Sequence, residues 1–252
     1  EKLEIKQKIA LGIMCIVVLC MSMLYITANG ILKTLINNSE RKHAQDNLQS
    51  QTRMIEEYVA RQEAILTAYS KTPAIRDALK EPSNTEKIAY AQEYTKSFFS
   101  DLKNWEGIYV GEWNSHVIVH STPSVVGMTT RKGDSLKALQ NEITSRNGLY
   151  NAGIIISPAS GKLILSMYCP VFDTNGSTIV GYVGGGPFVE DLEQILNRFL
   201  DNESTSKYYM INVQDGMYIT AEDRSLIATE IKDDMLLNVS EQIKSGNHSG
   251  EL

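Results

Sequence analysis

Hydrophobic and polar positions divide the chain into stretches with different periods. From Ile9 to Leu32 the chain runs for 24 residues without a charged side chain. A helix rising about 1.5 Å per residue would extend this run over about 36 Å, against about 30 Å for the hydrocarbon core of a bilayer. The pattern therefore predicts a transmembrane helix that anchors a more polar remainder.

Two other interpretations of this run stay open at the level of sequence. A buried core helix seldom needs so long a stretch without a polar stripe. The apolar region of a cleaved signal peptide spans only about 7 to 15 residues. We favour an uncleaved anchor, but charge does not set its orientation, because three basic residues lie on each side of it. They are Lys2, Lys6 and Lys8 before the run, and Lys33, Arg41 and Lys42 after it.

A helical period follows the apolar run. Apolar residues recur at spacings of three, four or their sums at Ala44, Leu48, Ile55, Tyr58, Val59, Ile65, Leu66 and Tyr69. This spacing predicts a long amphipathic helix that continues to about Ser70, where Thr72-Pro73 interrupts it. Two shorter helices are expected at 74–79 and 85–103, the second capped by Asn84. The long helix could couple the membrane to the polar part, or serve only as a coiled-coil stalk.

From Trp105 onward the period changes to two or to short apolar runs, which indicates strands. We expect five of them, at 108–113, 116–120, 149–157, 162–171 and 178–184. A looser segment at 121–133 and a helix at 134–146 separate the second strand from the third. These elements predict a five-stranded antiparallel sheet packed against helices, an α+β module. We interpret Gly184-Gly185-Gly186 as a flexible exit from the last strand.

A second, shorter module is expected after a helix at 188–200 and a polar spacer at 201–207. Its strands are predicted at 208–213 and 218–221, with a helix at 234–245. Another strand is expected to begin at the chain end, so we expect this module to be partial. The predicted divisions of the whole chain are a flank at 1–8, a transmembrane helix at 9–32, a helical lead-in at 33–104, the sheet module at 105–200 and the partial module at 201–252.

Composition and charge exclude several function classes. The chain has 24 Lys and Arg against 30 Asp and Glu, a net charge of −6, so nucleic acid is not an expected partner. Its three cysteines fit neither a disulfide framework nor a zinc site. His116 and His120 would lie about 13 Å apart along a strand, too far for one metal. No catalytic constellation or cofactor motif emerges, so we expect neither an enzyme nor a cofactor.

Several motifs resemble the double Cache sensor region of bacterial chemoreceptors and related transmembrane receptors. They are GIYVGEW at 107–113, HVIVHSTPSVVG at 116–127, the hairpins of 151–185 and YYMINVQDGMYIT at 208–220. The resemblance covers nearly the whole chain. It implies a PAS-like membrane-distal module that binds a small ligand outside the cytoplasmic membrane, a second Cache module, and a homodimer formed through the long helix.

Eight residues are candidates for contacting a ligand. Tyr109 and Trp113 share parity on the first strand, and so can line one face of the sheet together. His120 and Arg131 flank the looser segment, which would form a lid. The remaining candidates are Tyr150, Asn151, Ser157 and Tyr168. Strand alternation turns Tyr150 and Asn151 to opposite faces, so at least one of the two cannot contact the ligand. An arginine in a pocket favours a carboxylate.

The resemblance also limits the ligand class. Amino-acid-binding double Cache sensors carry an Arg closely followed by a Trp-Tyr pair, and then a Tyr and an Asp near the later hairpin. Here 130–135 reads TRKGDS, without the aromatic pair, and Ile155 and Ser157 stand where the Tyr and Asp would be. An α-amino acid would therefore lack its ammonium partner. We expect a small extracellular metabolite, either an organic acid or another polar compound, and no standard amino acid.

These observations predict an extracellular sensor held at the cell membrane by a single span, with ligand occupancy passed through the long helix. A chemoreceptor is the favoured class because of the resemblance. The sensor of a histidine kinase or diguanylate cyclase, and an anchored interaction domain without a small ligand, remain alternatives.

Overall fold

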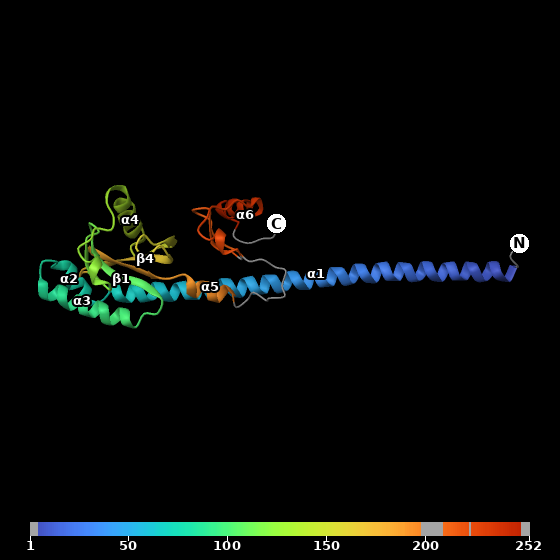
Figure 1. Ribbon diagram of the computed structural model, residues 1–252, viewed down its shortest axis with the longest axis horizontal. Coiled ribbons are helices and arrows are strands. Elements are labelled where there is room, and N and C mark those ends of the chain that lie inside the picture. The colour runs from blue at the N-terminus through green and yellow to red at the C-terminus, as the bar shows by residue number, and fades with distance from the viewer. Residues whose placement is uncertain (1–4, 198–208, 222, 248–252) are drawn as a thin grey trace. The chain divides into compact units, whose positions relative to one another are not determined.

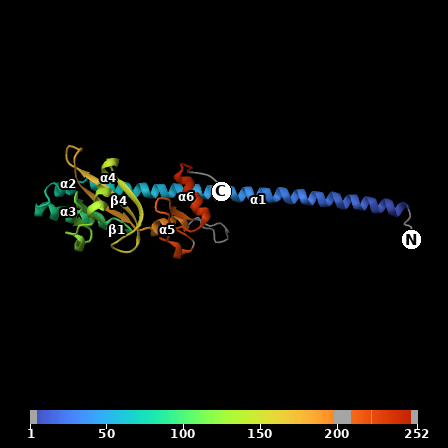
Figure 2. The same ribbon diagram turned by 90° about the horizontal axis from the view of Figure 1, so that it is seen from above.

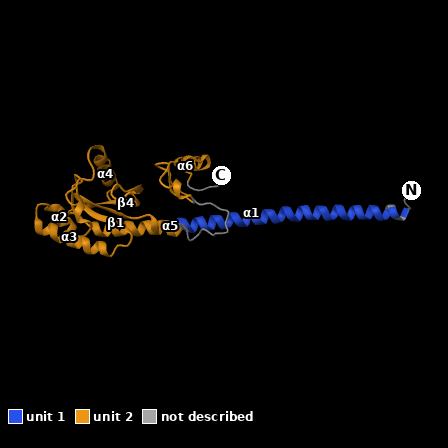
Figure 3. Ribbon diagram, viewed as in Figure 1, with its two compact units in different colours: residues 1–52 blue, residues 53–252 orange. Residues whose placement is uncertain are grey.

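The computed structural model describes residues 5–197, 209–221 and 223–247. The chain divides into two compact units, residues 1–52 and residues 53–252 (Figure 3). The first unit contains most of the long helix α1 (Ile5–Ser70). The predicted end of that helix at Ser70 is confirmed.

The apolar run within α1 is exposed along its whole length. Leu19 is 69% exposed and Met23 is 73% exposed. This exposure does not fit a buried core helix, in which the described residues would cover such side chains. By length and composition, α1 can cross a membrane.

Two short helices follow α1 where the sequence predicts them. The first, α2 (Pro73–Lys80), begins at the proline that interrupts α1. The second, α3 (Thr85–Ser100), begins after Asn84, whose side-chain oxygen accepts a hydrogen bond from the Lys87 amide at 3.3 Å. The cap satisfies one of the amides that a helix start leaves without an intrahelical partner.

The expected five-stranded antiparallel sheet is confirmed (Figure 1). Its strands are β1 (Trp105–Glu112), β2 (Val117–His120), β3 (Tyr150–Ile156), β4 (Leu163–Phe172) and β5 (Ile179–Pro187). Their order across the sheet is β2-β1-β5-β4-β3, so the last strand in sequence lies in the middle. The short 3-10 helix η1 (Pro123–Val125) and the helix α4 (Gly133–Arg146) connect β2 to β3.

Helices cover both faces of the sheet (Figures 1 and 2). On one face lies the main core, to which α1, α2 and α3 contribute side chains such as Tyr69, Ile75 and Ala91. The Tyr69 hydroxyl hydrogen-bonds the Thr95 hydroxyl at 2.6 Å within this core. On the other face, α4 packs Leu139 and Ile143 against tyrosines of the sheet. This second face carries the candidate site.

The sequence interpretation of the glycine triplet as a flexible strand exit is wrong. Gly184, Gly185 and Gly186 are strand residues of β5, and all three pair with β1. A Cβ atom built on Gly186 would lie 1.7 Å from the Leu165 carbonyl oxygen. The triplet is glycine because the neighbouring strands leave no room for a side chain.

A bulge in β3 changes which side chains share a face. The β3–β4 register shifts between Asn151 and Ile154, and Gly153 has a φ of +79°. Consequently Ala152 packs on the α4 side of the sheet, whereas Ile154, two residues later, packs in the main core. Simple alternation would have placed both on one side.

The remaining described elements agree in kind with the sequence prediction, apart from one short 3-10 helix that the prediction did not include. They are α5 (Glu190–Asn197), β6 (Met210–Asn212), β7 (Met217–Thr220), η2 (Arg224–Leu226) and α6 (Asp234–Lys244). The hairpin β6–β7 and α6 share a small core of Tyr218, Ile231 and Leu236. The spacer at 201–207 and the strand expected at the chain end lie outside the described residues. The α+β architecture is thus confirmed.

Candidate functional site

Four tyrosines from four strands gather on the sheet face beneath α4. We call Tyr109, Tyr150, Tyr168 and Tyr182 the tyrosine face. The ring centroids lie 6.1 Å apart in each of three pairs: Tyr109 with Tyr182, Tyr182 with Tyr168, and Tyr168 with Tyr150. The rings therefore form a continuous aromatic surface with hydroxyl groups along it.

Glycines on the neighbouring strands make this arrangement possible. Gly184 pairs with both Tyr109 and Tyr168, and Gly111 pairs with Tyr182. A Cβ atom on Gly184 would lie 2.5 Å from Cζ of Tyr109, and one on Gly111 would lie 2.9 Å from Cζ of Tyr182. Each of these two rings thus lies flat across a strand that has no side chain at that point.

Arg131 brings a positive charge to the tyrosine face. Its Nη2 donates a hydrogen bond to the Tyr168 hydroxyl at 2.7 Å, and its guanidinium carbon lies 5.1 Å from the centroid of the Tyr168 ring. The Ser166 hydroxyl also donates to the Tyr168 hydroxyl, at 3.1 Å. Within the described residues no ion pair joins Arg131 to a carboxylate. Among the described residues the half-buried guanidinium donates to the Tyr168 hydroxyl, so it keeps further donors for an anion.

The segment that carries Arg131 is tied to the edge of the sheet. The Val117 amide donates to the Met128 carbonyl at 2.8 Å, the Gly127 amide donates to the Val117 carbonyl at 2.8 Å, and the Thr130 amide donates to the Ser115 carbonyl at 3.0 Å. These bonds extend the sheet beyond β2, so Arg131 follows a well-supported backbone.

Hydrogen bonds also fix the end of the face nearest Trp113. The Tyr182 hydroxyl donates to Ser115 Oγ at 2.9 Å and lies 3.5 Å from Thr130 Oγ1. Gln140 of α4 donates its side-chain amide to the Trp113 carbonyl at 2.8 Å. Trp113 itself packs against the same cluster as the tyrosines.

The surroundings of Tyr109 favour its uncharged form. Burial raises the pKa of Tyr109, and the neighbouring Tyr168 and Tyr182 raise it further. Tyr109 therefore stays protonated at neutral pH and can donate its hydroxyl proton to an anionic group.

His120 lies beside this face, at the end of β2 and before the looser segment at 121–133. Its ring stacks on Tyr109 with centroids 5.7 Å apart and planes inclined by 10°. Its Nδ1 accepts the Thr122 amide at 2.8 Å, which requires the lone pair of the neutral imidazole. Burial lowers the pKa of His120, and the charge of Glu106 only partly offsets this effect.

The folded protein is expected to lose stability as the pH falls from 7.5 to 5.5, in part through His120. Because the folded state lowers the pKa of this group, the unfolded chain takes up its proton first as the pH falls below about 6.5. Thermal unfolding at the two pH values should show a smaller stability loss in His120→Gln than in the wild type. His43→Gln serves as the control for losing a histidine. An unchanged loss in His120→Gln would contradict the prediction.

The structure brings six of the eight predicted site residues together. Tyr109, Tyr150 and Tyr168 belong to the tyrosine face, Trp113 packs against it, and Arg131 and His120 contact its rings. Whether these six contact a ligand remains a prediction.

Asn151 and Ser157 do not reach this face, so we remove them from the candidate set. Asn151 turns to the opposite side of the sheet, where its side-chain amide donates to the Glu63 carboxylate of α1 at 2.8 Å. Ser157 is 2% exposed, and its hydroxyl oxygen accepts the Ala159 amide at 3.1 Å. Ser157 therefore stabilises the β3–β4 turn.

Tyr182 is the main residue that the sequence interpretation missed. Tyr182 lies two residues before Gly184 in the expected strand at 178–184. Alternation alone therefore predicts that the two residues lie on the same face of the sheet. The relation of Tyr182 to Tyr109 and Tyr168 depends on β5 lying between β1 and β4, which the sequence order does not reveal.

No protein-family model matches this chain, and no curated protein sequence matches it. Solved structures do match. The sensor domain of the V. cholerae histidine kinase DctB is 16% identical, with a TM-score of 0.60 over 79% of this chain and 73% of that one. The sensory domain of the Campylobacter jejuni chemoreceptor Tlp3 with isoleucine bound is 15% identical, with a TM-score of 0.59 over 83% and 81%.

A third similar structure is the ligand-binding domain of the Pseudomonas fluorescens chemoreceptor CtaA in complex with L-isoleucine. It is 17% identical, with a TM-score of 0.50 over 73% of this chain and 69% of that one. At such identities the likeness concerns the fold. This chain therefore has the Cache-type fold shared by these sensor domains of chemoreceptors and histidine kinases.

Proposed function

We propose that this chain is the extracytoplasmic small-molecule sensor of a transmembrane signalling receptor, in the chemoreceptor class, and that its ligand binds at the tyrosine face. The observation that carries the proposal is Arg131, a guanidinium held on the Tyr168 ring and hydroxyl. A charge placed on an aromatic surface with several hydroxyl groups suits recognition of a small polar molecule.

The ligand class follows from the charges of the site. Arg131 can form a bidentate pair with a carboxylate, and the neutral Tyr109 hydroxyl can add a further hydrogen bond. The resemblance to amino-acid-binding double Cache sensors places Ile155 and Ser157 where those sensors carry the Tyr and Asp that hold an ammonium group. An organic acid without an amino group therefore fits better than an amino acid, although two of the similar structures bind isoleucine.

The receptor would be anchored by the apolar part of α1, with the sheet module outside the cell. Ligand occupancy would change the populations of two arrangements of the sensor, and α1 would carry that change to the membrane in a homodimer. The length of α1, from Ile5 to Ser70, supports this role.

A panel of metabolites tests the proposal by its effect on thermal unfolding of the full chain in nanodiscs. A selective ligand at about 100 times its Kd stabilises the folded state by about 2.7 kcal/mol. For a domain of this size that corresponds to a rise of about 5 to 10 °C in Tm. We expect one or more small organic acids to give such a rise.

Amines of the same carbon skeleton serve as the control in this panel, because Arg131 repels them. A rise in Tm with isoleucine or valine, without any with an organic acid, would overturn the proposed ligand class. No rise with any compound would favour an anchored interaction domain instead.

A histidine-kinase sensor is the second candidate, because the DctB sensor domain has the same fold. The two candidates differ in the segment that a receptor gene encodes after the sensor. A long helical hairpin with heptad repeats would support a chemoreceptor, whereas a catalytic domain would support a kinase.

A further inference from the structure

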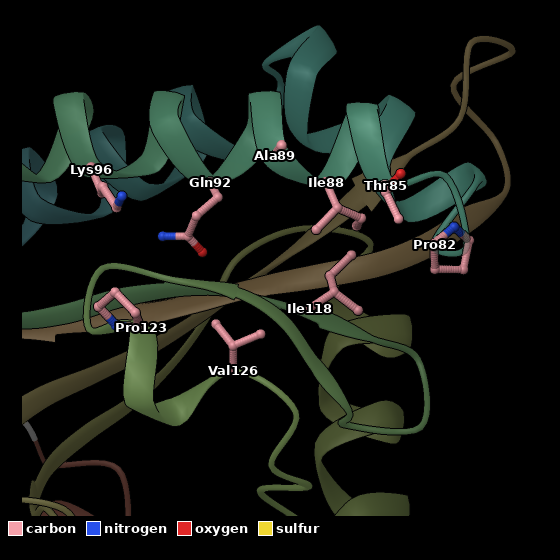
Figure 4. Close-up of a pocket in the computed structure, with 9 residues that line it drawn as sticks. All are labelled: Pro82, Thr85, Ile88, Ala89, Gln92, Lys96, Ile118, Pro123 and Val126. Carbon is pink, nitrogen blue, oxygen red and sulfur yellow. The ribbon is translucent and has the colours of Figure 1, made fainter.

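A groove of about 470 Å³ lies between α3 on one side and β2 with η1 on the other (Figure 4). This volume falls within the range of about 300 to 1,000 Å³ typical of small-molecule sites. Its walls are mainly apolar, formed by Pro82, Ile88, Ala89, Ile118, Pro123 and Val126. None of these residues belongs to the tyrosine face, which lies beneath α4.

The apolar side chains that the groove exposes to a ligand are those of Pro82, Ala89, Pro123 and Val126, whereas Ile118 is only 7% exposed. Figure 4 shows Ile88 of α3 opposite Ile118 of β2, with Val126 beside Ile118. Val126 is 40% exposed. Covering such surface removes it from water, which favours binding in proportion to the apolar area covered.

The side-chain amide of Gln92, in the wall of the groove, already makes two hydrogen bonds. Gln92 donates from Nε2 to the His120 carbonyl at 2.8 Å, and its Oε1 accepts the His120 amide at 3.2 Å. Both ends of this amide are therefore occupied by the backbone of β2. A ligand in the groove meets the hydrocarbon part of Gln92 rather than a free polar group.

Lys96 lies at one end of the groove and Pro82 at the other (Figure 4). The Lys96 ammonium contacts Glu93 at 2.7 Å, and both side chains are largely exposed. Such an exposed pair is weak, and an ammonium group has three donors. Lys96 can therefore donate to an anion at this end of an otherwise apolar groove, in exchange for its contact with Glu93.

We infer that the groove binds a small amphipathic carboxylate, with its hydrocarbon part against Ile88, Ala89 and Val126 and its carboxylate at Lys96. This site is separate from the tyrosine face and does not depend on the function proposed for it. Gln92 connects the two regions, because it lines the groove and holds the backbone of His120, whose ring stacks on Tyr109.

Titration calorimetry of the full chain in nanodiscs with butanoate, pentanoate and hexanoate tests the inference. Each added methylene should tighten Kd by about two- to fourfold, the gain expected for burying up to one CH₂ group. Hexanol should bind more weakly than hexanoate. Absence of measurable hexanoate binding, or equal binding of the alcohol, would overturn the inference.

Two variants locate the binding. Ala89→Phe should fill the groove and abolish hexanoate binding, whereas Ser97→Phe places the same ring on an exposed part of α3 outside the lining and should not. Lys96→Gln should weaken hexanoate binding by about two- to fivefold and leave hexanol binding unchanged. Lys137→Gln on α4 is its control.

The Arg131→Gln variant separates this site from the tyrosine face. Hexanoate binding that survives in Arg131→Gln and is lost in Ala89→Phe supports the groove. The opposite pattern means that hexanoate binds at the tyrosine face, and it would overturn the groove while leaving the proposed sensor function intact.

Discussion

Replacing Arg131 by glutamine is expected to lower the affinity for the anionic ligand of the tyrosine face by about 10- to 150-fold. A hydrogen bond to a charged group contributes about 1.5 to 3 kcal/mol, which corresponds to this range. The described contacts of the Arg131 side chain are with Tyr168, so the variant removes the charge without disturbing the main core. Titration calorimetry with the acid identified by the thermal screen measures the effect.

Arg76→Gln is the matched control for this experiment. Arg76 lies on α2, on the other side of the sheet, and pairs with Asp77 at 3.2 Å. The Arg76→Gln variant should therefore keep the wild-type affinity for the anionic ligand. If Arg131→Gln also keeps wild-type affinity while remaining folded, Arg131 does not bind the ligand and the proposed site is wrong.

Replacing Gly186 by alanine is expected to destabilise the sheet module by at least about 3 kcal/mol, the upper part of the range for forcing atoms into a packed interior. The new Cβ would lie 1.7 Å from the Leu165 carbonyl oxygen and 2.8 Å from the carbonyl carbon. Neither atom can move aside as a flexible side chain would, because both belong to the backbone of β4. Denaturant or thermal unfolding of the full chain measures the loss.

Gly148→Ala provides the comparison. A Cβ there would lie 3.7 Å from its nearest neighbour, the Arg146 carbonyl oxygen, which is an ordinary contact. This variant should be close to wild type in stability. Equal stability of the Gly186 and Gly148 variants would mean that β4 and β5 are less closely packed than the structure shows.

The elements of the fold that depend on residues close together in the sequence could be predicted from it. The helix start at Asn84 and the end of α1 at Ser70 follow from a capping side chain and a proline. The strands β1 to β5 follow from short runs of apolar residues between turn sequences. The glycine triplet was misread because a run of glycines has the same local signal in a flexible loop and in a strand without space for side chains.

The candidate site could be predicted only in part. Alternation along β1 correctly placed Tyr109 and Trp113 on one side of the sheet. It could not choose between Tyr150 and Asn151, because the choice depends on which face α4 covers. Tyr182 and the groove beside α3 involve residues from separate strands and helices, and no local pattern marks such contacts.

The sequence by itself determined the apolar run of α1, the α+β composition and the order of helices and strands, since these depend on chain composition and on periods of two or 3.6. Only the tertiary structure decided that β5 lies between β1 and β4, that glycines of one strand support tyrosines of the next, and that Arg131 reaches Tyr168. Strand order and the packing of side chains across strands arise from contacts between residues distant in the chain, so they depend on how the whole module folds.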